Sequence, residues 1–327
     1  MGKKFTIGVL IGNVHTAHPK DLMRGIRAAA SGMDVNMIYF LGTQSVRFNQ
    51  KFALEDFDYQ YNTVYDYAKL AKVDVLIIAY GSLCIFQENE DKQAFLDKFA
   101  GIPYVLLEDA TDDPRGIYVM VDNYGGMQKC VEHLIIEHHL KHLVYLGGPE
   151  DNQDAIERKA AFLNVMAEHH LPVTPEMMAV GDYSEFVDNL VEQLLRDNPD
   201  AEAIISANDE MTVACYRVCK AHGLRIGKDI LITGFDDVER ARYSNPPLTT
   251  VSQDAYKMGQ IAVEKAVDIC AGRPVESVRL DAELIIRESC GCKVTRRAKE
   301  KADEKTELLH IIDELRLFQH KSWLGPF

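Results

Sequence analysis

Residues 203–254 constrain the fold of this chain more than any other stretch of the sequence. Two apolar runs, AIISA and ILITGF, flank a helical pattern, as in a β-strand, α-helix, β-strand unit. Asn208 and Asp209 directly follow the first predicted strand. Asp236 and Asp237 directly follow the second. In an open parallel sheet the ligand binds beyond the carboxyl ends of the strands. This segment therefore predicts one half of a small-molecule cleft.

Apolar strand patterns and helical patterns alternate along almost the whole chain. Such alternation is typical of parallel sheets that helices cover on both faces. The predicted strands are residues 5–11, 35–40, 73–79, 103–106, 117–121, 142–146, 177–180, 203–207, 230–235 and 280–286. The predicted helices include residues 20–31, 124–138, 154–169, 184–197 and 253–272. These strands are too many for one sheet, and a crossover near residues 121–123 divides them into two similar halves. We therefore predict an α/β fold of two doubly wound parallel-sheet lobes.

The acidic balance of the chain limits the partners that it can have. Lys and Arg number 36 against 50 Asp and Glu, which gives a formal net charge of −14. Proteins bind a nucleic-acid backbone through clustered Lys and Arg, so we expect no direct nucleic-acid binding by this chain. No secretory leader is recognisable, and the longest apolar runs are far too short to span a bilayer. A cytoplasmic protein that does not enter a membrane is expected.

The cysteines predict core packing more than chemistry. Four of the seven fall within helical apolar patterns and are expected in the core: Cys130, Cys215, Cys219 and Cys270. Cys290 and Cys292, separated by one glycine, are able to ligate a metal or form a redox pair. No second cysteine pair or histidine cluster stands nearby in sequence, and His138 and His142 straddle a predicted helix-to-strand turn. Reduced thiols without a metal or cofactor are expected.

An aromatic-rich stretch occupies residues 42–67, with three phenylalanines and four tyrosines after residue 47. It is compatible with stacking on a cofactor, with a subunit interface, or with packing of its own apolar side chains. The third interpretation is favoured.

The C-terminal residues 293–327 differ in kind from the rest. A strongly charged run of good helix formers comes first, and Leu308, Ile311, Leu315 and Phe318 then follow at a and d spacing for under two heptads. This pattern fits either an amphipathic helix docked on the body or a connector helix that pairs with a second subunit. We favour the connector.

Catalytic signatures are missing from the sequence. It contains no phosphate-binding G-x-x-x-x-G-K-[ST] loop, no G-x-G-x-x-G, no G-x-S-x-G and no H-E-x-x-H. We therefore predict that the chain is not an enzyme.

A series of short motifs, in order between residues 5 and 292, resembles the effector-binding domain of the LacI/GalR family. The motifs are VDNYGG with VEHLI, YLGGP, ERKAAF, GDYS, AND, TGFDD, NPPLTTVSQD, MG and IIRESC. Each is weak alone, but the ordered set is specific. The resemblance implies the type I periplasmic-binding-protein fold, in which two lobes joined by a multi-strand hinge close around a small molecule. It also implies a homodimer.

The resemblance also implies lobes that are discontinuous in sequence. The first lobe is expected to take residues 3–121 and 253–274, and the second lobe residues 122–252 and 275–292. Residues 293–327 are then a C-terminal helix or a linker to an output domain.

Polar ligand contacts are implied in the second lobe. Arg158 matches an arginine that reaches ligand hydroxyls or carboxylates from a helix start. Asn208 and Asp236 match polar contacts at strand ends, and Tyr183 matches an aromatic residue against the ligand ring. Gln253 matches a hinge-side position that closes the cleft. Such a set suits a sugar, which binds through hydrogen bonds and an apolar ring face.

First-lobe and crossover contacts are assigned only by their position after predicted strands. The expected residues are Asn13, His15, Tyr80, Ser82, Asp122, Asn123 and Tyr124. His15 is equally well explained as a simple surface residue. In the second lobe, Asp209 is also explained as a cap of the following helix, and Asp237 as a loop residue.

One departure from the family pattern bears on function. Repressors of this family begin with a helix-turn-helix head, whereas here the first predicted strand begins at Phe5. The layout resembles sensor modules that are fused ahead of bacterial signalling outputs, without readout of DNA. The expected function is sensing of a sugar, nucleoside or similar molecule, with the signal passed through rearrangement of a dimer. The alternatives are a solute-binding protein for transport and a transcription-regulator fragment that lacks its DNA-binding head.

Overall fold

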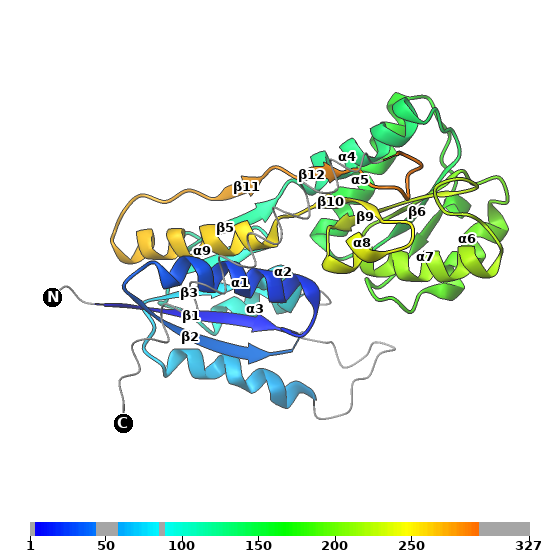
Figure 1. Cartoon of the computed structure of the whole chain (residues 1–327). Coiled ribbons are helices and arrows are strands. Elements are labelled where there is room, and N and C mark those ends of the chain that lie inside the picture. Colours follow the sequence, from blue (N-terminus) through cyan, green and yellow to red (C-terminus); the bar gives the residue numbers. More distant parts are fainter. Residues whose placement is uncertain (1–3, 44–57, 85–88, 294–327) are drawn as a thin grey trace, which may run out of the picture.

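The computed structural model describes residues 4–43, 58–84 and 89–293 of the chain. These residues form two lobes, each built on a six-stranded sheet (Figure 1). The first sheet contains β1 (Phe5–Gly12), β2 (Val35–Gly42), β3 (Val75–Ile78), β4 (Tyr104–Leu107), β5 (Gly116–Val121) and β11 (Val278–Leu280). The second contains β6 (Leu143–Gly147), β7 (Met178–Val180), β8 (Ala203–Ser206), β9 (Leu231–Asp236), β10 (Thr249–Ser252) and β12 (Glu283–Ile285).

The strand orders confirm the predicted α/β fold of two doubly wound lobes. The first sheet runs β11-β5-β4-β3-β1-β2 and the second runs β12-β10-β9-β8-β6-β7. Neighbouring strands pair in parallel, apart from β10 and β12, which are antiparallel. All residues of β3, β4 and β8 are buried. Apolar strands of this kind are typical of parallel sheets that are covered on both faces.

Helices of different kinds pack on each sheet. The first lobe carries α1 (Ala17–Ser31), the 3₁₀ segment η1 (Asp58–Lys69), α2 (Tyr80–Leu83), α3 (Asn89–Asp97) and α9 (Ala255–Cys270). The second lobe carries α4 (Asn123–Glu132), the π-helical turn η2 (His133–Glu137), α5 (Gln153–Glu168), the 3₁₀ turn η3 (Pro175–Met177), α6 (Asp188–Asp197), α7 (Asp209–Ala221) and α8 (Glu239–Tyr243). None of the helices in the described part of the chain is long and apolar enough to cross a membrane.

Helices α1 and α9 lie against each other along the first lobe (Figure 1). Two glycines make this close approach possible. A Cβ atom at Gly25 would lie 1.9 Å from the carbonyl oxygen of Tyr256, and one at Gly259 would lie 2.4 Å from the carbonyl oxygen of Leu22. A residue with a side chain at either position would therefore push the two helices apart. Although α9 follows the second-lobe strands in sequence, it belongs to the first lobe.

The chain passes between the lobes at three places. These are the links from β5 to α4, from β10 to α9 and from β11 to β12. The third link corrects the sequence analysis, which predicted one strand over residues 280–286. That stretch is interrupted at Asp281 and Ala282, because β11 pairs with β5 in the first sheet whereas β12 pairs with β10 in the second. The first-lobe sheet therefore extends beyond residue 274, where the sequence analysis ended that lobe.

Other boundaries differ from the predicted ones at helix ends. The first helix begins at Ala17 instead of residue 20, and the helix predicted from residue 184 begins at Asp188. The helix predicted over residues 124–138 is α-helical only to Glu132 and continues as the π-helical turn η2. Cys130, Cys215 and Cys219 are buried as predicted, whereas Cys270 is half-buried.

The aromatic-rich stretch is described only from residue 58 onwards. There the Tyr65 ring is buried and meets the Phe95 ring edge-on, with the ring centroids 6.0 Å apart. Its hydroxyl donates to the carbonyl oxygen of Thr43 at 3.2 Å. These contacts agree with packing of the segment onto its own lobe. The predicted connector helix lies outside the described residues, apart from Lys293.

Candidate functional site

Arg158 is the most completely enclosed charged group of the candidate site. Asn152 caps the start of α5 by accepting a hydrogen bond from the Ala155 amide at 2.9 Å, which fixes the helix that carries Arg158. The Arg158 side chain is 3% exposed. Its Nε donates to Oδ1 of Asn123 at 2.9 Å, and its Nη1 donates to the Ala207 carbonyl oxygen at 2.7 Å.

The guanidinium of Arg158 also lies over an aromatic ring and between two carboxylates. Its Cζ is 3.8 Å from the centroid of the Phe235 ring, a cation–π geometry that favours a buried cation. Oδ2 of Asp154 lies 3.5 Å from Nη2, and Oδ1 of Asp236 lies 3.6 Å from Nη1. Arg158 therefore compensates the charge of both carboxylates.

Each of these carboxylates is held by an amide side chain. Nδ2 of Asn123 donates to Oδ1 of Asp154 at 2.8 Å. Nε2 of Gln253, which directly follows β10, donates to Oδ1 of Asp236. Asp236 ends β9 with φ at 118°, a conformation that residues with a side chain rarely adopt. Strained backbone of this kind clusters at ligand and active sites.

The first lobe contributes a second charged pair. Nε2 of His18, on α1, lies 2.6 Å from Oε1 of Glu108. The other Glu108 oxygen accepts from the Ser82 amide at 2.7 Å and from its hydroxyl at 2.5 Å. Glu108 directly follows β4 and is buried, with φ at 72°. We refer to His18, Glu108, Asp154, Arg158 and Asp236 as the inter-lobe cluster.

The pKa values of this cluster reflect charges that come from both lobes. Burial alone would lower the pKa of His18, but the carboxylates of Glu108, Asp236 and Asp154 outweigh it and raise the pKa to about 9. Burial would raise the pKa of Glu108, but His18 outweighs it and lowers that pKa. Burial raises the pKa of Asp154 to about 7, against the opposing effect of Arg158, and raises the pKa of Asp236. At neutral pH the cluster thus holds two cations beside carboxylates.

Five of the residues predicted as ligand contacts lie in this cluster or hydrogen-bond to it. They are Ser82, Asn123, Arg158, Asp236 and Gln253. The structure thus brings them together from both lobes and from the hinge. Whether they touch a ligand stays a prediction.

Four other predicted residues have structural partners of their own. Asn208 caps α7 by accepting from the Met211 amide at 3.0 Å, and its Nδ2 donates to the Tyr183 carbonyl oxygen at 3.1 Å. The Tyr183 hydroxyl donates to Oδ1 of Asn152 at 3.2 Å. Asp122 caps α4, and the Tyr124 hydroxyl accepts from the side chain of Asn164 at 2.9 Å.

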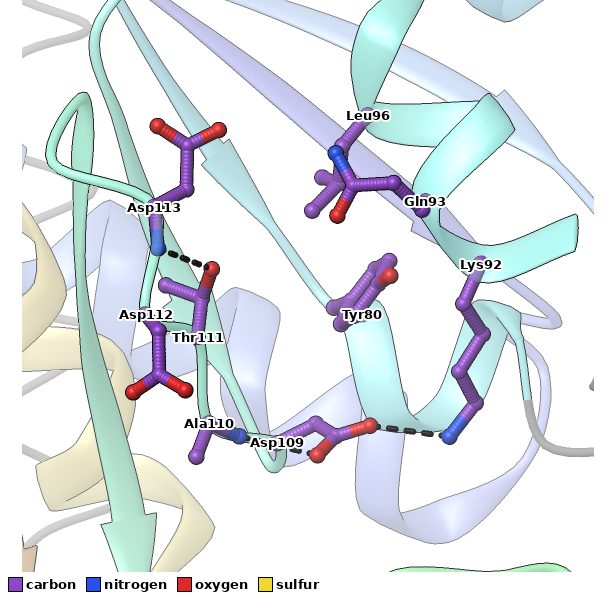
Figure 2. A pocket seen from close by; sticks show the side chains of 9 residues that line it. All are labelled: Tyr80, Lys92, Gln93, Leu96, Asp109, Ala110, Thr111, Asp112 and Asp113. Carbon is purple, nitrogen blue, oxygen red and sulfur yellow. Dashed lines mark hydrogen bonds and ion pairs between the residues drawn. The ribbon is translucent and has the colours of Figure 1, made fainter. Parts of the chain in front are cut away.

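The last three predicted residues lie in the first lobe. Asn13, with φ at 49°, forms the turn after β1, and His15 is exposed in the same turn. Tyr80 is buried, and its ring lines an open hollow of about 520 Å³ that also takes in residues 109–113. Figure 2 shows the ring between that loop and Lys92, whose Nζ lies 2.9 Å from Oδ2 of Asp109. No residue of the inter-lobe cluster lines this hollow.

Asp209 and Asp237, which were predicted as a helix cap and a loop residue, both make hydrogen bonds within the second lobe. Asp209 is the first residue of α7 and not its cap, which is Asn208. Its buried carboxylate accepts from the Thr250 hydroxyl at 2.6 Å and from the Val238 amide at 3.0 Å, so it ties α7 to β10 and to the segment between β9 and α8. Asp237 is a loop residue, as predicted, and its Oδ1 accepts a hydrogen bond from Nη2 of Arg287 at 2.5 Å.

Three residues of the cluster were missed by the sequence analysis. Glu108 follows an apolar strand, so the rule that selected Asp236 selects it equally well. Asp154 stands four residues before Arg158 on one helix, and such pairs lie on the same helix face. His18 had no comparable signal, because the helix was expected to begin two residues after it.

The chain is similar in sequence to one protein family model and to known transcriptional regulators. Residues 131–290 match the family described as the periplasmic binding protein-like domain. The HTH-type transcriptional regulator CelR of Thermobifida fusca is 30% identical over 218 residues, which are 64% of this chain and 63% of that protein. The chain thus spans less than two thirds of the length of this curated relative.

Solved structures share the fold. A CelR–cellobiose complex superposes with a TM-score of 0.72 at 23% identity, over 87% of this chain and 84% of that one. A lac repressor dimer bound to operator and the anti-inducer ONPF superposes with a TM-score of 0.73 at 23% identity, over 89% and 82%.

Proposed function

We propose that the chain is an effector-binding domain of the LacI/GalR type, as its motifs predict, and that it senses a neutral, polyhydroxylated small molecule held between its lobes. A sugar is such a molecule. The likeness to the periplasmic binding protein-like domain and to CelR supports this proposal. The observation that carries the proposal is the inter-lobe cluster. Its first-lobe pair, His18 and Glu108, is coupled electrostatically to Asp236 of the second lobe, which Arg158 contacts together with Asp154. A ligand that contacts both sets favours the closed arrangement of the lobes through its differential affinity.

The charges of the cluster favour a neutral ligand that donates hydrogen bonds. Three carboxylates stand against two cations, and Arg158 already donates to Asn123 and to the Ala207 carbonyl. A ligand with its own negative charge would therefore meet more carboxylates than free donors. Sugar hydroxyls donate to carboxylates and accept from His18, so they suit this set. The relative CelR was solved with cellobiose, which supports a saccharide.

A thermal-shift panel tests the ligand class. The panel pairs neutral sugars with their acid counterparts, such as glucose with glucuronate, and adds nucleosides and amino acids. We expect a neutral sugar to raise Tm, and its acid counterpart to have a smaller effect. A larger shift with the acid would contradict the proposal, and so would no shift with any neutral sugar or nucleoside.

A matched pair of variants locates the binding site. Asp236→Asn should weaken binding of the identified ligand by about tenfold or more, which corresponds to roughly 1.4 kcal/mol. Asp34→Asn changes the same kind of side chain at an exposed position on the first lobe, where it pairs with Lys4, and should bind normally. Isothermal titration calorimetry measures both. Equal affinities in the two variants would place the ligand elsewhere.

We also propose that the domain binds its ligand without turnover and works as a homodimer. The curated relative is named as a transcriptional regulator, and a lac repressor of this fold was solved as a dimer. Mass spectrometry should recover the ligand chemically unchanged after incubation. Light scattering should give the mass of two chains, and a monomer would remove that part of the proposal.

Two outputs compete for the signal. A sensor module fused to a signalling domain was predicted from the sequence, whereas the relatives favour a transcription regulator as the second candidate. A ligand-dependent change in binding of a DNA duplex by the native protein would support the regulator. A ligand-dependent change in the activity of an attached output domain would support the sensor module.

A further inference from the structure

Two histidines and two cysteines converge in the second lobe, away from the inter-lobe cluster. His133 is the first residue of η2 and His138 directly follows its end, and Cys290 and Cys292 follow β12. One donor atom of each residue lies within 4.8 Å of the others. We refer to these four residues as the Cys2His2 cluster. The two histidines precede Cys290 by more than 150 residues in sequence, so no local spacing signals the cluster.

We propose that the Cys2His2 cluster binds one Zn²⁺ ion with tetrahedral coordination. Zinc bonds of about 2.3 Å to sulfur and about 2.0 Å to nitrogen put two nitrogens roughly 3.3 Å apart and a nitrogen and a sulfur roughly 3.5 Å apart. Nε2 of His133 and Nε2 of His138 are 3.3 Å apart. Sγ of Cys292 lies 3.3 Å from Nε2 of His138 and 3.7 Å from Nε2 of His133. These separations are close to the edges of such a tetrahedron.

The chemistry of the four donor atoms indicates which metal the cluster would bind. Two thiolates and two imidazoles in a tetrahedral arrangement favour zinc over magnesium or calcium, which prefer oxygen ligands. Both histidines present the same ring nitrogen, Nε2, toward the cysteine sulfur. Four protein ligands leave no open position for water or substrate, so the site is structural and not catalytic.

Two local backbone features build the cluster. His133 and His138 are five residues apart, a spacing that a π-helical turn places on one face and an α-helix does not. Their rings meet edge-on, with the centroids 5.0 Å apart. Gly291, between the cysteines, has φ at 86°, a conformation that glycine adopts at little cost. The sharp bend at Gly291 lets two cysteines so close in sequence approach the same pair of rings.

The proposed ion joins distant parts of the chain. Its ligands tie the end of helix α4 to residues 290–292, which come just before the last described residue, Lys293. Bound zinc would therefore hold residues 290–292 against the end of α4. No ligand of this site belongs to the inter-lobe cluster, so the proposal does not depend on the nature of the effector.

The experiment measures zinc in the full chain, purified under a reducing agent and reconstituted with Zn²⁺ before buffer exchange. We expect about one zinc per chain by mass spectrometric metal analysis. Cobalt substitution should give the visible bands of tetrahedral Co²⁺ together with a thiolate charge-transfer band. Cys292→Ser and His138→Gln should each lose at least half of the bound zinc. With cobalt, Cys292→Ser should lose intensity in the thiolate charge-transfer band, and His138→Gln should lose the tetrahedral bands.

Controls separate the site from adventitious binding. Cys270→Ser removes a cysteine on α9, and His142→Gln removes a histidine whose Nδ1 lies 2.9 Å from Oδ2 of Asp200. Both should retain full zinc. A chelator should lower the Tm of the wild-type protein by several degrees and that of Cys292→Ser by clearly less, because a metal that binds only the folded state stabilises it.

Three results would overturn the proposal. They are a reduced wild-type chain that retains no zinc, equal zinc in the wild type and in both cluster variants, and a Cys290–Cys292 disulfide that persists under reducing conditions. Circular dichroism of each variant shows whether a loss of zinc reflects a lost ligand or a lost fold. If His138→Gln unfolds, Cys292→Ser still tests the loss of a ligand, because Cys292 is only half-buried.

Discussion

Nε2 of His18 lies 2.6 Å from Oε1 of Glu108, and this pair joins the start of α1 to the end of β4. Ser82 adds two hydrogen bonds to the second Glu108 oxygen. Buried charges are stable only when they are paired in this way. The pair therefore fixes the first-lobe half of the inter-lobe cluster.

The His18–Glu108 pair should make stability depend on pH in a known direction. The pKa of His18 rises from 6.5 to about 9 on folding, chiefly because nearby carboxylates outweigh the effect of burial. A raised histidine pKa contributes stability that is fully present below about pH 6.5 and is lost as the pH rises to 9. Urea unfolding of the wild type should show this loss, on the order of 2–4 kcal/mol.

His18→Gln should flatten that part of the stability profile. His15→Gln, which changes an exposed histidine in the adjacent turn, should keep the slope of the wild type. The pKa of Glu108 is lowered, so its contribution has the opposite sign and is lost as the pH falls below about 4.5. A His18→Gln profile that still falls between pH 6.5 and pH 9 would assign the effect to another group.

Removal of Arg158 should destabilise the second lobe strongly. Arg158→Ala leaves Asp154 and Asp236 without their cation and Asn123 without a donor. Removing one partner of a buried ion pair lowers the free energy of unfolding by about 3–5 kcal/mol. Arg196→Ala, on the exposed face of α6, should change stability by less than about 0.5 kcal/mol. Equal unfolding midpoints for the two variants in urea would contradict the charge-compensation role.

Close packing of α1 on α9 predicts a sharp difference between two glycines. Gly25→Ala puts a Cβ 1.9 Å from the Tyr256 carbonyl oxygen, so the helices must separate, and we expect a loss of about 2 kcal/mol or more. Gly32→Ala meets nothing closer than 3.7 Å and has φ at −90°, so it should be close to neutral. Thermal unfolding followed by circular dichroism compares them. Similar Tm values would show that α9 adjusts its position freely.

The fold was predictable because its signals are local and repeated. Apolar strands such as Val75–Ile78 and Ala203–Ser206 are buried on both faces, and the motif order matched a known arrangement of lobes. The split of residues 280–286 between two sheets was not predictable. Strand propensity reports that Leu280 and Leu284 favour extended backbone, but not which sheet each one joins.

The candidate site was predictable where a strand end carries its own signal, as at Asp236, or where the motifs resemble a known family, as at Arg158. Asp236 and Arg158 stand at recognisable positions, and Glu108 obeys the same strand-end rule. Partners such as His18 depend on how the two lobes meet, which no local pattern encodes. The Cys2His2 cluster was hidden for a related reason, because a π-helical turn sets the five-residue spacing of His133 and His138.

Asp154 should tune ligand binding near neutral pH. Burial raises its pKa to about 7, with Arg158 opposing and Glu108 adding to the shift. An ionised carboxylate accepts hydrogen bonds from sugar hydroxyls more strongly than a protonated one. Affinity for a neutral sugar should therefore rise a few-fold between pH 6 and pH 8, as measured by calorimetry.

Asp154→Asn separates this effect from the other titrating groups. The variant cannot ionise, so its affinity should vary less than that of the wild type over the same pH range. Stability changes in the opposite sense: a carboxyl whose pKa is raised on folding lowers stability as the pH rises from about 4 to 7, and the variant should lose that slope. Asp34→Asn keeps both slopes because it alters an exposed residue of the first lobe. An Asp154→Asn variant with the binding profile of the wild type would exclude this carboxylate from the ligand site, whereas a flat profile would place it there.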